Sequence, residues 1–339
     1  MIVAHHYVLH SGLLYLMSQD TLSFRSIYLY LFGMWGKTGI NCFVLITGYF
    51  MCRSNISLRK YTILFFQIEF YNLLFFILFA CAGYYNSYSI KDILKILFPF
   101  DRVGRVFPES FLLFYLLIPF LNILIKNINN IRHGILILIL LTSYSIMSTF
   151  SFVEVKVNYV IWFCILYLIS SYIRLYGFGK SINPKVWGMT AFLFIILSML
   201  SVILFLVNGE TSWPFFYVSD SNKVLPLLVS VCFFMFFNGI HVPQSKFINT
   251  IGASTFGILL IHDNSPMMRE WLWKKVFNNT DWYYNNIFYH SIVCVVCIYF
   301  ICSSIDLIRL QLFEMPLIKA INKKFRKNDN ILSRWWWKI

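Results

Sequence analysis

Three histidines stand within the first ten residues, at positions 5, 6 and 10 of a mostly apolar stretch. Ionisable side chains are costly in such a stretch, so each is a candidate functional group. Histidine suits proton transfer because its ordinary pKa lies near neutrality. His6 and His10 are four residues apart and share a helix face, whereas His5 points about 100° away. Catalysis by one of these rings and hydrogen bonding between helices both remain open.

A metal site is not predicted from these residues. Two histidines at i, i+4 hold zinc in proteases, but there a glutamate completes an HExxH pattern. His6 and His10 are separated by Tyr7, Val8 and Leu9 instead.

Five further ionisable residues fall inside or beside apolar runs. Lys37 either reaches the outer surface along its own stem or takes part in chemistry. Glu69 is expected to face the bundle interior or a cavity. His262 and Asp263 close an apolar run and are expected near the outer end of a helix. Asp306 is expected at the cytoplasmic interface.

The composition indicates which class of protein carries these ionisable groups. The chain has 339 residues, of which 59% are hydrophobic and 12% charged, against roughly 25% charged in ordinary soluble domains. These values exclude a soluble globular enzyme, a disordered chain and a disulfide-stapled module. The apolar runs are continuous, which also excludes an outer-membrane barrel with alternating strands. No P-loop, paired-glycine nucleotide fingerprint or GxSxG elbow occurs, which argues against ATP-driven transport by this chain alone.

The apolar windows predict an all-α polytopic membrane protein with about ten transmembrane helices, since one span needs roughly 20 apolar residues. Residues 1–315 are predicted to form one integral membrane domain, and residues 316–339 a basic, Trp-rich cytoplasmic tail. The predicted spans are 1–17, 31–52, 62–82, 109–126, 133–150, 158–175, 187–207, 223–240, 251–268 and 287–309.

The net charge of +14 is assigned to membrane orientation and not to nucleic acid. Basic residues collect in cytoplasmic loops, and the tail carries the densest cluster, between Lys319 and Lys338. Both termini are therefore predicted in the cytoplasm, with the tail against anionic lipid. In the loop 83–108 the spacing of the apolar residues 90, 93, 94 and 97 predicts an interfacial helix. In the loop 263–286 the tryptophans and tyrosines form either an aromatic belt or a sugar-stacking platform.

Five segments, in order, resemble the signatures of membrane acyltransferase family 3. The most extensive is Trp35–Phe50, which is similar to the family signature G-V-x-x-F-F-x-x-S-G-[FY] and ends in the typical ITGYF. Ile2–Tyr7 resembles the close of the family's first helix, where an Arg precedes a His. The others are Arg59-Lys60, Phe114–Asn122 and Phe256–His262. Together they cover nearly the whole chain.

The chain departs from the family pattern at two places. The family's Arg would stand eleven positions before His6, where this sequence has no residue, and we interpret Met1 as an internal start. The Trp that usually precedes the fourth helix is replaced by Phe107-Pro108-Glu109.

The resemblance implies transfer of an acyl group, usually acetyl, from a cytoplasmic CoA thioester to an exported or lipid-linked glycan in a bacterial inner membrane. Acyl-CoA is then a co-substrate, and no cofactor is bound permanently. His6 is the expected base, and the Arg that this sequence lacks, Lys37 or Tyr7 is the expected donor to the oxyanion. Arg59 and Lys60 are expected to hold the CoA phosphates or only to orient the chain. His262 positions the acceptor or packs.

Two other functions share the helices and basic loops. A polysaccharide flippase or polymerase is expected to line its cavity with Arg and acidic residues, of which the inner helices offer few beyond Glu69. A membrane-bound O-acyltransferase that modifies lipids would need a single His in an apolar helix. Thioester consumption separates both acyltransferases from the transport protein.

Overall fold

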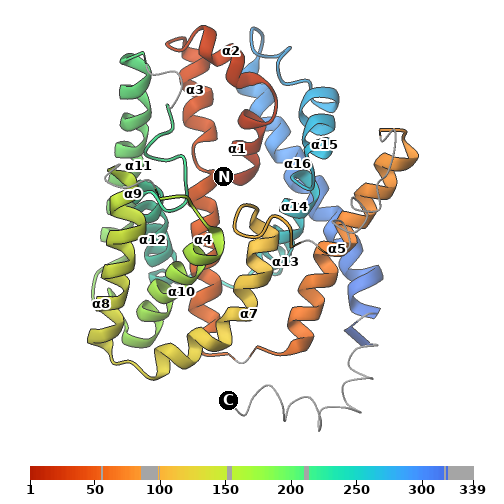
Figure 1. The fold of residues 1–339 in the computed structure, drawn as a ribbon. Helices are drawn as coiled ribbons and strands as arrows, with labels where there is room; N and C mark the ends of the chain where they lie inside the picture. The colour runs from red at the N-terminus through yellow and green to blue at the C-terminus, as the bar shows by residue number, and fades with distance from the viewer. Residues whose placement is uncertain are drawn as a thin grey trace.

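The structure, a computed structural model, describes residues 1–54, 56–84, 98, 100–150, 155–209, 214–316 and 318–319, and within these ranges every regular element is a helix. Figure 1 shows them as one bundle. In chain order the helices are α1 (Ile2–Leu9), α2 (Leu13–Gln19), α3 (Phe24–Gly33), α4 (Gly36–Met51), α5 (Leu58–Cys81), α7 (Phe107–Lys126), α8 (Asn130–Leu141), η1 (Thr142–Ile146), α9 (Met147–Thr149), α10 (Tyr159–Tyr176), α11 (Pro184–Val207), α12 (Val224–Gly239), α13 (Lys246–Ala253), α14 (Thr255–His262), α15 (Pro266–Glu270), η2 (Trp271–Val276), α16 (Ile287–Arg309) and η3 (Leu310–Glu314).

The predicted class, an all-helical multi-pass membrane protein, is confirmed. Among the described residues, 7 helical stretches are long and apolar enough to cross a membrane, fewer than the ten expected. α12 is apolar but has only 16 residues. The 7 stretches are Phe24–Met51, Leu58–Cys81, Phe107–Asn127, Asn130–Thr149, Tyr159–Tyr176, Pro184–Val207 and Ile287–Glu314.

The first predicted span, 1–17, is wrong as a single helix. α1 ends at Leu9, and α2 begins after Gly12, whose φ is +84°. Only glycine adopts that backbone conformation without steric cost, so the sequence favours a break here. The break at residues 10–12 therefore separates α1 from α2.

The predicted span 251–268 is also wrong as a single helix, because it is broken twice. Ser254 separates α13 from α14, and the chain leaves helical geometry again at Asp263. Ser265 is extended and caps the backbone N–H of Met268, as expected for a residue that precedes a proline. This second break places Asp263 on irregular backbone, which occurs at membrane depth only where it faces protein or a cavity.

α4 lies at the centre of the bundle and packs against α1, α10 and α12 (Figure 1). Glycines make these approaches possible, as small residues commonly do between membrane helices. At Gly48 an added Cβ would lie 2.2 Å from Ser170 Oγ and 3.1 Å from the Tyr167 Cα. At Gly36 it would lie 2.4 Å from the ring of His5. α4 can therefore approach α1 and α10 this closely only because neither position carries a side chain.

Gly48→Ala is expected to destabilise the fold by about 1–3 kcal/mol, the usual range for forcing a methyl group into a packed interface. The measurement is the thermal unfolding temperature of the purified protein in detergent. Gly252→Ala is the matched control, because no atom lies within 4 Å of its added Cβ. Equal unfolding temperatures of the two variants would contradict the tight α4–α10 contact.

Asp306 is buried between helices, a contact that its expected place near the cytoplasmic interface did not predict. Its side chain is 1% exposed. Oδ1 accepts hydrogen bonds from Tyr71 of α5 at 2.7 Å and from Arg309 Nε at 2.8 Å. The guanidinium of Arg309 also donates to Glu314 at 2.6 Å. Glu69 is buried as predicted, 6% exposed on α5.

The structure tests only one of the two loop predictions, the one for the aromatic loop 263–286. The interfacial helix expected at residues 90–97 and the tail 320–339 lie outside the described residues. In the aromatic loop, Trp273 and Tyr283 are buried and therefore unavailable as a sugar-stacking surface, whereas Tyr284 is exposed. Trp273 packs edge-on against Tyr7 of α1, with ring centroids 5.7 Å apart. This part of the loop holds α1 in place.

Candidate active site

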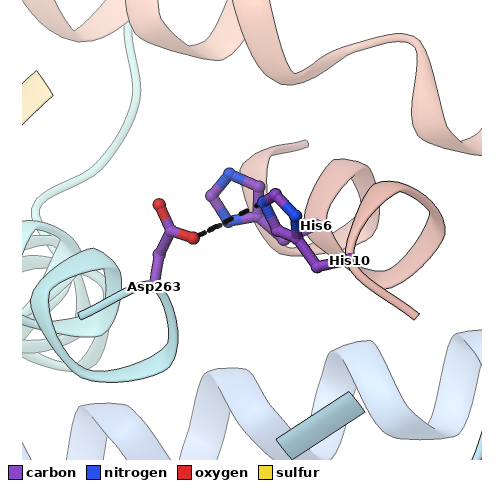
Figure 2. Close-up of side chains that lie close together, drawn as sticks. All are labelled: His6, His10 and Asp263. Atoms are coloured by element: carbon purple, nitrogen blue, oxygen red, sulfur yellow. Dashed lines mark ion pairs between the residues drawn. The ribbon is translucent and has the colours of Figure 1, made fainter. Parts of the chain in front are cut away.

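The break after α14 faces the histidines of α1 (Figure 2). Nδ1 of His6 lies 3.0 Å from Nε2 of His262 and 3.5 Å from Oδ1 of Asp263. Nε2 of His10 lies 3.7 Å from the same carboxylate oxygen. Two segments about 250 residues apart in sequence thus form one cluster of three imidazoles and a carboxylate.

Asp263 is held by Arg269, which comes from α15. The guanidinium donates from Nε to Oδ1 at 2.6 Å and from Nη2 to Oδ2 at 3.1 Å, a bidentate pair that fixes the carboxylate plane. Both side chains retain some exposure, 16% for Asp263 and 30% for Arg269.

His5 does not belong to this cluster. Its Nδ1 lies 2.6 Å from the backbone carbonyl of Gly33, and its ring covers Gly36. It connects α1 to the junction between α3 and α4, which is the structural role that stood open for the three histidines.

Lys37 points into the bundle, because its Nζ donates to the hydroxyl of Tyr159 at 2.9 Å. It lies close enough to interact electrostatically with His5, His10 and Asp263. The structure thus brings Lys37 near the histidine cluster, and the alternative that it only reaches the surface loses support.

Arg59 and Lys60 are not part of the cluster. Both are exposed in the first turn of α5, at the end of the bundle where α4 also ends (Figure 1). α4 has 16 residues and therefore spans about 24 Å between Gly36, beside His5, and Met51 at that end. These two cations can reach the cluster only through a long bound molecule.

One group of side chains has the composition of a metal site. His6, His10 and Asp263 each offer a ligand atom within 4.8 Å of the other two. However, Arg269 already binds both oxygens of Asp263. A divalent cation would have to displace this guanidinium or share the carboxylate with it, at a cost in electrostatic repulsion. The three side chains are therefore better suited to proton transfer than to binding a metal ion.

A small cavity with both polar and apolar walls adjoins the cluster at Asp263. Its walls include two amide side chains and two ion pairs, contributed by Asn72, Asn264, Arg102, Glu109, Asp263 and Arg269. Arg102 Nη2 lies 2.7 Å from the buried Glu109 carboxylate. A larger cavity of about 560 Å³ is apolar and lies beyond the opposite side of α1, between Phe24, Tyr28 and Trp35.

Asp263 and Arg269 were missed as site residues in the sequence analysis. Asp263 had a signal, because it follows His262 directly, but its position in an expected helix gave no reason to pair it with His6. Arg269 had none, since a basic residue in an outer loop looks like an ordinary solvated charge. Their roles depend on the helix break at residues 263–265 and on the packing of α1 against α14.

The fold and this cluster define a multi-pass membrane protein with a partly buried histidine–carboxylate centre. The family model described as "Acyltransferase domain" matches residues 1–309. The chain therefore belongs to acyltransferase family 3, as its motifs indicated, and is an acyltransferase. The family gives no support to the flippase alternative. No curated protein and no solved structure matches the chain.

Proposed function

We propose that this protein transfers an acetyl group from acetyl-CoA to a hydroxyl of an exported or lipid-linked glycan, with His6 as the base. The observation that supports it best is the geometry of His6. Its Nδ1 faces His262 and Asp263. Among the described residues no hydrogen bond uses its Nε2, which leaves that nitrogen open to a substrate.

The reaction needs one proton to move twice. A sugar hydroxyl is a poor nucleophile, and it gains strength when His6 Nε2 takes its proton during attack on the thioester carbonyl carbon. A tetrahedral oxyanion forms, the C–S bond then breaks, and the imidazolium returns the proton to the leaving sulfur. The products are the glycan ester and free CoA.

The oxyanion needs a donor or cation. Lys37 is our candidate, since it lies inside the bundle near the cluster and is anchored to Tyr159. Tyr7 is less suited to this role, because its hydroxyl already pairs with Nδ1 of His290 at 2.8 Å.

The acceptor and the donor approach from different sides in this proposal. Amide and charged side chains bind sugar hydroxyls through hydrogen bonds, and the cavity that contains Asn72 and Asn264 opens beside Asp263. Arg59 and Lys60 hold the CoA phosphates at the other end of α4, with the thioester arm extending toward His6. We also propose that the enzyme resides in the plasma membrane of a bacterium and that its basic tail binds anionic lipid.

Radiolabelled acetyl-CoA tests the proposed function. Membranes containing this chain, incubated with the label and a panel of surface glycans, are expected to release CoA thiol and to acetylate glycan in equal amounts. CoA release no faster than in membranes without the chain would overturn the proposal. Label that enters lipid but no glycan would contradict the acceptor class.

The double variant Arg59→Gln/Lys60→Gln is expected to raise the KM for acetyl-CoA about tenfold, which corresponds to roughly 1.4 kcal/mol, with little change in kcat. The control is Lys126→Gln/Arg132→Gln, which removes the same charge from two other exposed positions. Steady-state kinetics in membranes measures both. An equal rise of KM in the control would show a nonspecific effect of charge.

A further inference from the structure

The position of the proton on His262 follows from its partners. Nδ1 of His262 lies 2.6 Å from the backbone carbonyl oxygen of Ile258, one turn earlier in α14. A carbonyl oxygen only accepts hydrogen bonds, so Nδ1 carries the proton. In a neutral imidazole the other nitrogen then has a free lone pair. Nε2 of His262 is therefore a hydrogen-bond acceptor. His262 is 1% exposed.

The same logic then applies to His6. Its Nδ1 faces the lone pair of His262 at 3.0 Å and the carboxylate oxygen of Asp263 at 3.5 Å. Both neighbours are acceptors, so Nδ1 of His6 donates. The proton of a neutral His6 thus sits on Nδ1, and Nε2 keeps the lone pair.

Asp263 also stabilises the protonated form of His6. When His6 takes a proton on Nε2 the ring becomes a cation, and a carboxylate 3.5 Å from Nδ1 stabilises it. Arg269 holds this carboxylate in plane through two hydrogen bonds. His10 shares the same oxygen at 3.7 Å but has no hydrogen bond to His6.

We propose that His262 and Asp263 are positioning residues, which hold the proton of His6 on Nδ1 so that Nε2 faces the substrate as a base. The inference rests on the proposed function for its catalytic meaning. The arrangement of the proton itself is a property of the resting protein and can be measured without turnover.

The first experiment is nitrogen NMR of the full chain, labelled with ¹⁵N-histidine and reconstituted in lipid at neutral pH. The resonances of His6 are assigned by difference from His6→Gln. We expect a protonated Nδ1 and an unprotonated Nε2 in the wild type. In the double variant His262→Leu/Asp263→Asn the His6 signals should show both tautomers. A wild-type His6 with its proton on Nε2 would overturn the inference whether or not the chain transfers acyl groups.

The second experiment is kinetic. Asp263→Asn is expected to lower kcat by up to about 10⁴-fold, the loss found when the carboxylate behind a catalytic histidine is neutralised, with KM nearly unchanged. His262→Leu is expected to lower kcat about 10- to 100-fold. Asp263→Glu, which restores the charge, should recover part of the loss.

His241→Leu is the matched control for these variants. It removes an exposed imidazole in the connection between α12 and α13, and a loss as large as that of His262→Leu would contradict a specific role for the His262 acceptor. Thermal unfolding of each variant in detergent identifies losses that come from misfolding. If wild-type His6 carries its proton on Nδ1 but no CoA is released, the proposed function fails and the positioning stands.

Discussion

His6→Ala is expected to lower the rate of acyl transfer about 10²- to 10⁴-fold, the contribution typical of a general base. Its Nε2 is the open nitrogen of the cluster, and no other imidazole of α1 has an equivalent position. His5 is bound to the carbonyl of Gly33, and His10 lies at the edge of the Asp263 carboxylate. The measurement is the initial rate of label transfer from acetyl-CoA to glycan.

The expected loss is catalytic and not structural. Removal of the His6 ring costs one hydrogen bond to His262, usually about 0.5–1.5 kcal/mol of stability, so the variant should remain folded. His241→Ala is the control, because His241 is exposed in the connection between α12 and α13. A normal transfer rate in His6→Ala would contradict the assignment of the base.

Arg309→Met is expected to reduce stability by about 3–5 kcal/mol, the cost of removing one partner from a buried ion pair. Arg309 is 5% exposed and donates to both Asp306 and Glu314. Without the guanidinium, Asp306 keeps only the hydroxyl of Tyr71, and a nearly fully buried carboxylate is left without a counter-charge. The unfolding temperature in detergent should fall accordingly.

Two comparisons test the cause of this destabilisation. Arg132→Met removes an exposed cation and should leave the unfolding temperature almost unchanged. Asp306→Asn/Arg309→Met removes both charges, and it should recover much of the loss, because the neutral amide costs less to bury. A double variant as unstable as Arg309→Met alone would argue that packing of the Arg309 stem, not charge, stabilises this end of α16.

The membrane class could be predicted from the sequence because it depends on composition. Long apolar helices such as α11 and α16 satisfy their own backbone hydrogen bonds wherever they lie, so a hydropathy window identifies them without knowledge of their neighbours. The windows failed where helices are short. α1 and α14 have eight residues each, and the breaks beside them come from local backbone geometry at Gly12 and before Pro266.

The candidate site was predicted only in part, for a similar reason. Composition and spacing indicated His6, Lys37 and His262, because an ionisable group in an apolar stretch stands out one residue at a time. Asp263 lies near the end of an expected helix, and Arg269 looks like an ordinary solvated charge in an outer loop. Their role appears only when the packing of α1 against the end of α14 brings the two segments together.

The helical membrane class, the family and the histidine on which the proposed chemistry depends could therefore be predicted from the sequence alone. These properties reside in apolar run length and in short local motifs, which need no partner in space. The open nitrogen of His6, the carboxylate that faces it and the burial of Asp306 are visible only once the helices are packed together. Each of these depends on contacts between residues far apart in the chain, such as His6 with His262 and Tyr71 with Asp306, and no local pattern encodes such distances.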